Sequence, residues 1–387
     1  MKALVPVLMA VVLDLLGFGI VIPLLTFYAE EYGAGPVAVT LLMAVYSFAQ
    51  FLMAPIWGAL SDRFGRRPIM LFSIGMATFC LAGFAWAESL VMLFVFRTLH
   101  GAAAANISTA QACVADVTSL ENRAKGMGMI GAAFGLGFTV GPFVGGELSV
   151  HGLAAPIWFA AGLSLLNFVL AVLWLKETRK PDTKRPERSI HPSTFIKVAK
   201  HPVVGLCIVL TFVMTFAFAI MESSFTLFAE HVRDLDARSV GRMFGVAGLT
   251  MIAVQGGLIG RLVKRFGEAT LVPLGVGLLS LGLLLLPFAP PPSAMVLVFM
   301  LMAVGQGIAS PSLHSLISKG AQPNEQGFVL GTNQSMSALA RAVGPTMAGW
   351  LYIGGSTWPF FVSGGILAAA VPLAWAAAKQ PSKASAA

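Results

Sequence analysis

Long apolar runs, separated by short polar or Gly/Pro-rich segments, fill most of the chain. A helix needs about 20 mainly apolar residues to cross the ~30 Å hydrocarbon core of a bilayer. Membrane β-strands would be segments of about ten residues in which apolar and polar positions alternate, and the runs do not alternate. The pattern predicts an all-α membrane protein with twelve spans, at 4–28, 38–61, 68–87, 89–115, 126–148, 155–175, 202–228, 240–262, 270–289, 294–317, 327–350 and 357–378.

One long polar stretch, beginning K-E-T-R-K-P-D-T-K-R at Lys176, separates the sixth run from the seventh. We therefore expect an N-terminal six-helix bundle at 1–175, a linker at 176–200 and a C-terminal six-helix bundle at 201–387. The linker is rich in Lys and Arg, which suits a segment that lies against anionic lipid; the alternative is a solvated tether with a short surface helix near 193–200.

The composition excludes a soluble protein, because only 11% of the residues are charged against about 25% in soluble domains. The net charge of +8 does not call for nucleic acid, since twenty Lys and Arg fall in loops on one side of the membrane and three on the other. By the positive-inside rule both termini are cytoplasmic, as expected for a multi-pass protein of the cell (inner) membrane. The three cysteines lie within apolar runs and predict neither disulfides nor a metal site.

The two halves of the chain resemble each other. W-G-A-L-S-D-R-F-G-R-R ends the second span and G-G-L-I-G-R-L-V-K-R-F-G ends the eighth, while Gly141-Pro142 in span five matches Gly344-Pro345 in span eleven. Such repeats are the trace of a duplicated six-helix unit, and they favour a transporter that rocks around a site near the bilayer midplane.

These motifs also resemble a known family. G-A-L-S-D-R-F-G-R-R-P is similar to the loop signature of the major facilitator superfamily, and R-T-L-H-G, with Arg97 and Gly101, is similar to the fourth-span motif of its proton-driven members. The fifth-span glycines and Pro142 resemble the signature of the drug/proton antiporter subgroup, which includes tetracycline and quinolone exporters. The resemblance implies the major facilitator fold and export of amphipathic or drug-like molecules by alternating access.

Two groups of residues are expected to control the conformational change. The resemblance implies a cytoplasmic latch that closes against the start of span eleven near Gln326 and Gly327, the alternative being a loop whose charges only set topology. Because Asp116 lies at the cytoplasmic end of span four, we expect it to pair with Arg63. Glycine spacing in span five predicts a close helix seam with span eight, the alternative being ordinary membrane packing. The latch residues are Gly58, Asp62, Arg63, Gly65, Arg66, Arg67 and Asp116, and the seam residues are Gly131, Gly135, Gly141, Pro142 and Gly145.

Charged residues inside spans are costly and indicate function. Asp14 matches an acid of tetracycline exporters, Glu222 matches a seventh-span acid of quinolone exporters, and Arg97 belongs to the fourth-span motif. We expect these three residues to couple transport to protons. Which of the two acids is the main proton site stays open, and a structural Asp14–Arg97 ion pair is the alternative for one of them.

The remaining candidates line the substrate cavity. Polar residues one helical turn apart lie on the same helix face, and exposing that face to lipid costs free energy. Aromatic walls suit a small lipophilic, often cationic, substrate. The expected cavity residues are Phe18, Tyr46, Gln50, Phe134, Phe138, Phe218, Phe225, Asn333, Ser337 and Arg341.

The sequence carries no nucleotide-binding, metalloprotease or hydrolase motif. We therefore expect no enzyme activity, no cofactor and no metal, with protons and membrane lipid as partners and the monomer as the working unit. The alternatives are a proton-coupled uptake carrier for a sugar or other nutrient, a lipid-handling flippase, or a membrane sensor that does not transport.

Overall fold

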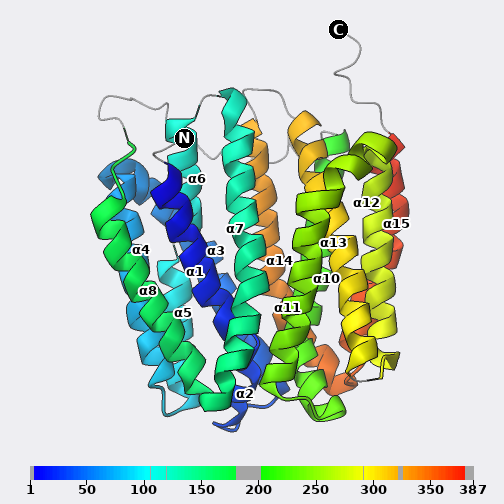
Figure 1. Ribbon diagram of the computed structural model, residues 1–387, viewed down its shortest axis with the longest axis horizontal. Coiled ribbons are helices and arrows are strands. Elements are labelled where there is room, and N and C mark those ends of the chain that lie inside the picture. The colour runs from blue at the N-terminus through cyan, green and yellow to red at the C-terminus, as the bar shows by residue number, and fades with distance from the viewer. Residues whose placement is uncertain are drawn as a thin grey trace. The chain divides into compact units, whose positions relative to one another are not determined.

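The computed structural model describes residues 4–104, 106–118, 120–179, 202–290, 292–320 and 326–379, and within these ranges it contains helices and no strand. This confirms the all-α prediction (Figure 1). The α-helices are α1 (Val5–Val21), α2 (Leu24–Glu30), α3 (Pro36–Phe64), α4 (Arg66–Ala85), α5 (Leu90–Ala103), α6 (Asn106–Val117), α7 (Leu120–Leu148), α8 (Ala154–Trp174), α10 (Pro202–Arg233), α11 (Ala237–Ala253), α12 (Ile259–Leu285), α13 (Ser293–Gly320), α14 (Gln326–Gly354) and α15 (Trp358–Lys379). Short helical turns η2 (Ser149–His151), η3 (Val254–Leu258) and η4 (Leu286–Phe288) join some of them.

Nine segments of the described chain are long and apolar enough to cross a membrane, or ten if α1 and α2, bent by 45° at their junction, form one span. One of these segments, Ala237–Phe288, has 52 residues, which is enough for two crossings. Helix α14, with 29 residues, is long enough for another. By length and apolarity the described residues thus give nine or ten spans, and the number of twelve stays a prediction.

Two compact units make up the chain. The first contains Met1–Asp182 and Ser223–Gly248, and the second contains Thr183–Glu222 and Leu249–Ala387. Helices α10 and α11 therefore contribute residues to both units. The expected boundary inside the linker stays a prediction, because residues 180–201 lie outside the described part of the chain.

In the first unit, α1 packs along α7 and α8, and α4 packs along α8. Glycines allow the first of these contacts: a Cβ on Gly141 of α7 would lie 2.6 Å from the carbonyl carbon of Gly19 on α1. The Asn167 side chain of α8 donates a 3.0 Å hydrogen bond to the Ala10 carbonyl. Because this bond satisfies the amide nitrogen of a buried side chain within an apolar core, it fixes α8 against α1.

In the second unit, α12 packs along both α13 and α15. Gly275 and Gly305 allow α12 and α13 to touch, and the hydroxyl of Ser280 donates a 2.8 Å hydrogen bond to the Gly364 carbonyl of α15. Gly344 of α14 packs against α10, where a Cβ would meet the side chain of Ala219 at 2.8 Å. The Gly-Pro pairs of both halves thus follow one rule, since each glycine lies against the first helix of its own six-helix repeat.

The two halves also break their helices at the same motif. Gly65 ends α3 with φ of +103°, and Gly267 interrupts α12 with φ of +75°; glycine adopts this left-handed region without the steric cost that other residues carry. In each half the preceding Arg-Phe pair is arranged alike, with Arg63 and Arg265 each 5.3 Å from the ring of the next residue. The duplicated motif is therefore a duplicated structure.

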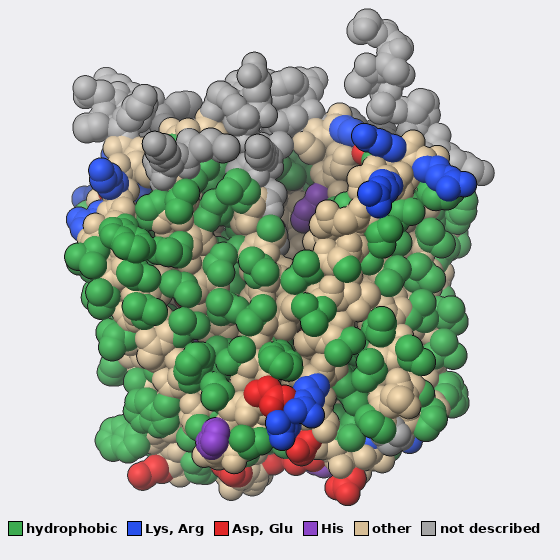
Figure 2. Space-filling model, in the orientation of Figure 1, with side chains coloured by type: hydrophobic (Ala, Val, Ile, Leu, Met, Phe, Trp, Pro, Cys, Tyr) green, Lys and Arg blue, Asp and Glu red, His purple; other side chains and the backbone are tan. Residues whose placement is uncertain are grey.

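The surface of the helices suits a lipid environment. On the face shown in Figure 2, hydrophobic side chains cover the middle of the helices and charged side chains gather toward the helix ends. Large apolar side chains such as Leu173, Leu297 and Trp350 are about two-thirds exposed. Exposed apolar surface on this scale is typical of a membrane-facing protein.

Candidate functional site

A buried arginine surrounded by aromatic rings occupies the first unit. The Arg97 side chain of α5 is 3% exposed, and its guanidinium carbon lies 4.6 Å from the ring centroid of Tyr46 and 5.3 Å from that of Phe18. The His100 ring packs edge-on against Tyr46 at 5.1 Å, and Phe138 packs against Phe18 at 6.0 Å. Four of the predicted site residues, from α1, α3, α5 and α7, therefore meet in one cluster.

The positive charge of Arg97 is buried in an unusual way, against aromatic rings. A buried guanidinium normally needs a carboxylate partner, yet no ion pair among the described residues joins Arg97 to Asp14, and its Nε has no hydrogen-bond partner there. Ring faces stabilise the cation instead. Asp14 lies on α1, one helical turn before Phe18, and is half-buried. The described residues therefore do not form the structural Asp14–Arg97 ion pair that was the alternative.

A second polar group lies in the second unit, where α10 and α14 face each other. Glu222 is half-buried and lies close enough to Arg341 for electrostatic attraction. Along α14, Asn333 is 3% exposed and Ser337 is 7% exposed, so the predicted polar stripe is buried. The Ser337 hydroxyl donates to the Asn333 carbonyl at 3.1 Å, and the Asn333 amide nitrogen lies 3.4 Å from His314.

The remaining predicted cavity residues divide into two kinds. Gln50, Phe134 and Phe218 are half-buried on α3, α7 and α10, and Phe134 stacks on Phe138 at 6.5 Å. Phe225 is fully buried and packs edge-on against Phe244 at 5.8 Å. Phe225 is thus a packing residue here, because a ring without exposed surface cannot line a cavity.

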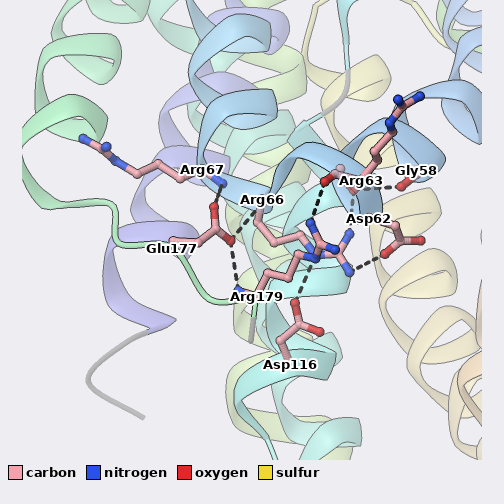
Figure 3. A network of polar contacts seen from close by, with 9 residues as sticks. Gly58, Asp62, Arg63, Arg66, Arg67, Asp116, Glu177 and Arg179 are labelled. Carbon is pink, nitrogen blue, oxygen red and sulfur yellow. Dashed lines mark hydrogen bonds and ion pairs between the residues drawn. The ribbon is translucent and has the colours of Figure 1, made fainter. Parts of the chain in front are cut away.

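The predicted latch residues form a network centred on Arg66 (Figure 3). Only 2% of the Arg66 side chain is exposed, and its guanidinium donates to Asp116 at 3.0 Å, Asp62 at 2.6 Å and Ser61 at 2.6 Å. The Ser61 hydroxyl in turn donates to the Gly58 carbonyl at 2.9 Å. We call Ser61, Asp62, Arg66 and Asp116 the Arg66 cluster. The expected partner of Asp116 was Arg63; the structure pairs it with Arg66, because Arg63 at the end of α3 points to solvent over Phe64.

Glu177, predicted only as part of the polar linker, caps the N-terminus of α4. Its carboxylate accepts hydrogen bonds from the backbone N–H groups of Arg66 at 3.0 Å, Arg67 at 3.1 Å and Arg179 at 2.9 Å. Burial favours the neutral acid, but the backbone donors outweigh it and hold the pKa of Glu177 below its ordinary value. A Cβ on Gly65 would lie 2.5 Å from the same carboxylate, so another residue there would displace the Glu177 side chain and also strain the backbone, whose φ is +103°.

The sequence does carry a signal for this cap. A helix N-terminus favours an acidic partner, and α4 has no acidic residue in its first turn. Arg179 completes the arrangement by donating from its guanidinium to the Arg63 carbonyl at 2.6 Å. The contact of the latch with Gln326 and Gly327 stays a prediction, because their side chains lie outside the described ones.

The glycines of span five, in α7, lie against two helices, α1 and α11. Gly141 and Gly145 of α7 lie against Gly19 and Ile20 of α1. Contact with α11 is made by Pro142 and by the neighbouring Gly146. The surroundings of Gly131 lie outside the description. A close α7–α11 seam is thus present in the first unit.

An ion-pair group closes the end of this seam. Glu147 of α7 accepts from Arg238 at 2.8 Å and from Arg242 at 2.5 Å, both on α11. The i, i+4 spacing of the two arginines was the available signal, since it places both on one helix face.

The sequence of the chain is similar to those of known membrane proteins. The family model described as the Major Facilitator Superfamily matches residues 7–345 and 256–387. The class C tetracycline resistance protein of Escherichia coli is 32% identical, with 92% of this chain and 91% of that protein covered. Multidrug resistance protein 2 of Bacillus subtilis (strain 168) is 29% identical, with 91% and 89% covered.

Solved structures agree on the fold. The crystal structure of the human organic anion transporter MFSD10 (TETRAN) superposes with a TM-score of 0.75 at 26% identity, covering 96% of this chain and 99% of that one. A bacterial homologue of the human lysosomal transporter Spinster gives a TM-score of 0.75 at 15% identity, covering 97% and 96%. This second likeness concerns the fold alone.

Proposed function

The chain belongs to the major facilitator superfamily and is a multi-pass membrane transporter rather than an enzyme, and from this premise we propose that it exports small amphipathic, drug-like molecules in exchange for protons. Relatives that match over nine-tenths of the chain are named tetracycline and multidrug resistance proteins, which supports efflux as the direction. The excess of Lys and Arg in loops on one side supports cytoplasmic termini.

One observation carries the proton coupling: Glu222 lies within the apolar helix α10 and close enough to Arg341 of α14 for electrostatic attraction. A carboxylate within a membrane helix is costly unless it is paired or protonated. Proton binding at Glu222 would cancel its attraction for Arg341, and loss of the proton would restore it. The charge of this pair thus differs between two states of the transporter.

Asp14 supplies a second exchangeable proton in the first unit. It lies one turn before Phe18, whose ring, with that of Tyr46, lies against the positive charge of Arg97. A substrate with an aromatic or lipophilic body fits between such rings. Each charge that moves through 100 mV yields about 2.3 kcal/mol, which, with a pH gradient, drives a useful concentration ratio.

Reconstituted transport tests the proposal. The purified protein in vesicles is given a pH gradient, and uptake of tetracycline or ethidium against its own gradient is followed for wild type, Asp14→Asn, Glu222→Gln and the double variant. We expect wild type and the exposed control Glu88→Gln to accumulate substrate, and the double variant to lose accumulation while it still exchanges substrate down a gradient. Equal accumulation by the double variant would refute the coupling.

The same vesicles separate the alternatives. A proton-coupled uptake carrier would alkalinise the medium on the side where substrate is added, whereas the proposed exchange releases protons there. A lipid flippase would move labelled lipid without a pH gradient. A sensor that does not transport would bind substrate without exchanging it.

A further inference from the structure

Three potential metal ligands meet at the ends of two helices, away from the residues used above. Glu30 is the last residue of α2, and Glu230 and His231 lie in the final turn of α10. Both segments belong to the first compact unit. Glu30 is far in the sequence from the adjacent Glu230 and His231, so no local motif predicts the group. We propose that Glu30, Glu230 and His231 form a binding site for a divalent transition-metal ion of the zinc type.

The distances between donor atoms suit such an ion. Nε2 of His231 lies 3.1 Å from Oε1 and 3.3 Å from Oε2 of Glu30, and one donor atom from each of the three residues lies within 4.8 Å of the others. A tetrahedral zinc ion, with bonds of about 2.0–2.2 Å, requires donor atoms about 3.3–3.6 Å apart. Small side-chain rotations bring all three donors to that spacing.

Electrostatics points to a cation at this place. The carboxyl groups of Glu30 and Glu230 interact directly, and two adjacent carboxylates repel unless a proton or a cation lies between them. Oε2 of Glu230 is buried and has no hydrogen-bond partner among the described residues. A buried acceptor left without a partner costs free energy, and coordination of a metal ion satisfies it.

The donor set selects the class of ion. One imidazole and two carboxylates suit zinc, whereas calcium and magnesium prefer ligand sets made of oxygen alone. The site is open to water, since 40% of the His231 side chain and 18% of the Glu30 side chain are exposed. Three protein ligands leave a fourth position for water.

A bound ion would fasten the end of α2 to the end of α10. Because a ligand that binds only the folded arrangement stabilises it by mass action, zinc should raise the melting temperature of the protein. It should also slow any conformational change that separates these two helix ends. The binding itself requires neither protons nor a transported substrate, so it stands or falls independently of the proposed exchange.

Titration of the purified full-length protein with ZnCl2 tests the site, with binding measured by calorimetry and stability by thermal unfolding. The cluster variants are Glu30→Gln, Glu230→Gln and His231→Gln; the matched controls are the exposed neighbour Glu31→Gln and the exposed His151→Gln. We expect one ion per chain and a rise in melting temperature for wild type and controls. Each cluster variant should bind zinc at least about tenfold more weakly.

Any of three results would overturn the proposal: zinc affinity in the cluster variants equal to that of the controls, no zinc binding to wild type below millimolar concentration, or magnesium binding as tight as zinc binding. Melting curves without metal identify any variant that fails to fold. In that case Co2+ binding to wild type decides whether the site exists. The absorption spectrum of the bound cobalt ion shows whether nitrogen and oxygen ligands surround it in a tetrahedral arrangement.

Discussion

Gly146 of α7 and Gly241 of α11 meet backbone to backbone, so that a Cβ added to Gly241 would lie 2.8 Å from the Cα of Gly146 and 2.5 Å from the carbonyl oxygen of Pro142. Real side chains do not reach such distances without a shift of the backbone. The α7–α11 seam therefore depends on the absence of side chains at two positions on different helices.

Substitution Gly241→Ala should separate α7 from α11. Overpacking of this kind costs about 1–3 kcal/mol, because the atoms in the way belong to a backbone. We expect a lower melting temperature and a loss of transport. The control is Gly162→Ala on α8, where a Cβ meets nothing within 4 Å and where alanine should be neutral or stabilising. Equal behaviour of the two variants would contradict the seam.

Arg66→Lys should destabilise the turn between α3 and α4. Lysine keeps the positive charge but cannot reproduce the planar set of donors that contacts Asp62, Asp116 and Ser61. Loss of one hydrogen bond to a charged group costs about 1.5–3 kcal/mol. Thermal unfolding in detergent measures the effect. Arg63→Lys is the matched control, because its side chain is exposed. If both variants melt alike, Arg66 is not the centre of the cluster.

The stabilising effect of Glu177 should depend on pH. Its folded-state pKa lies below the ordinary value, so the carboxylate stabilises the fold above the unfolded-state pKa of about 4.3, and this contribution is lost as the pH falls through the folded-state pKa. The melting temperature of wild type should exceed that of Glu177→Gln at pH 7, and the gap should close toward pH 3. A gap that is constant with pH, or one also seen with the exposed control Glu88→Gln, would argue against the cap.

The bonds of Glu147 to Arg238 and Arg242 should respond to salt. The two arginine side chains are 42% and 54% exposed, and exposed charges are screened as the Debye length falls from about 10 Å at 0.1 M to about 3 Å at 1 M salt. Glu147→Gln should lower the melting temperature at low ionic strength and have little effect at 1 M salt. In a double-mutant cycle with Arg238→Gln the second change should add little at low salt. Additive effects would show that the two residues do not interact.

Apolar run lengths determined the fold of this protein. Because a bilayer requires about 20 apolar residues for each crossing, the helices and the duplicated R-F-G breaks could be located from the sequence alone. The same constraint made the charges within the spans conspicuous, so Arg97, Glu222 and Arg341 were found without a structure.

Only the tertiary structure decided which of these groups touch. It paired Asp116 with Arg66 instead of Arg63, placed Arg97 against aromatic rings, placed Phe225 in a packed core and brought Glu177 to the start of α4. The sequence fixes the face of a helix on which a residue lies, but a contact also depends on helix rotation, depth and crossing. These follow from the packing of small residues across helices, which no local pattern records.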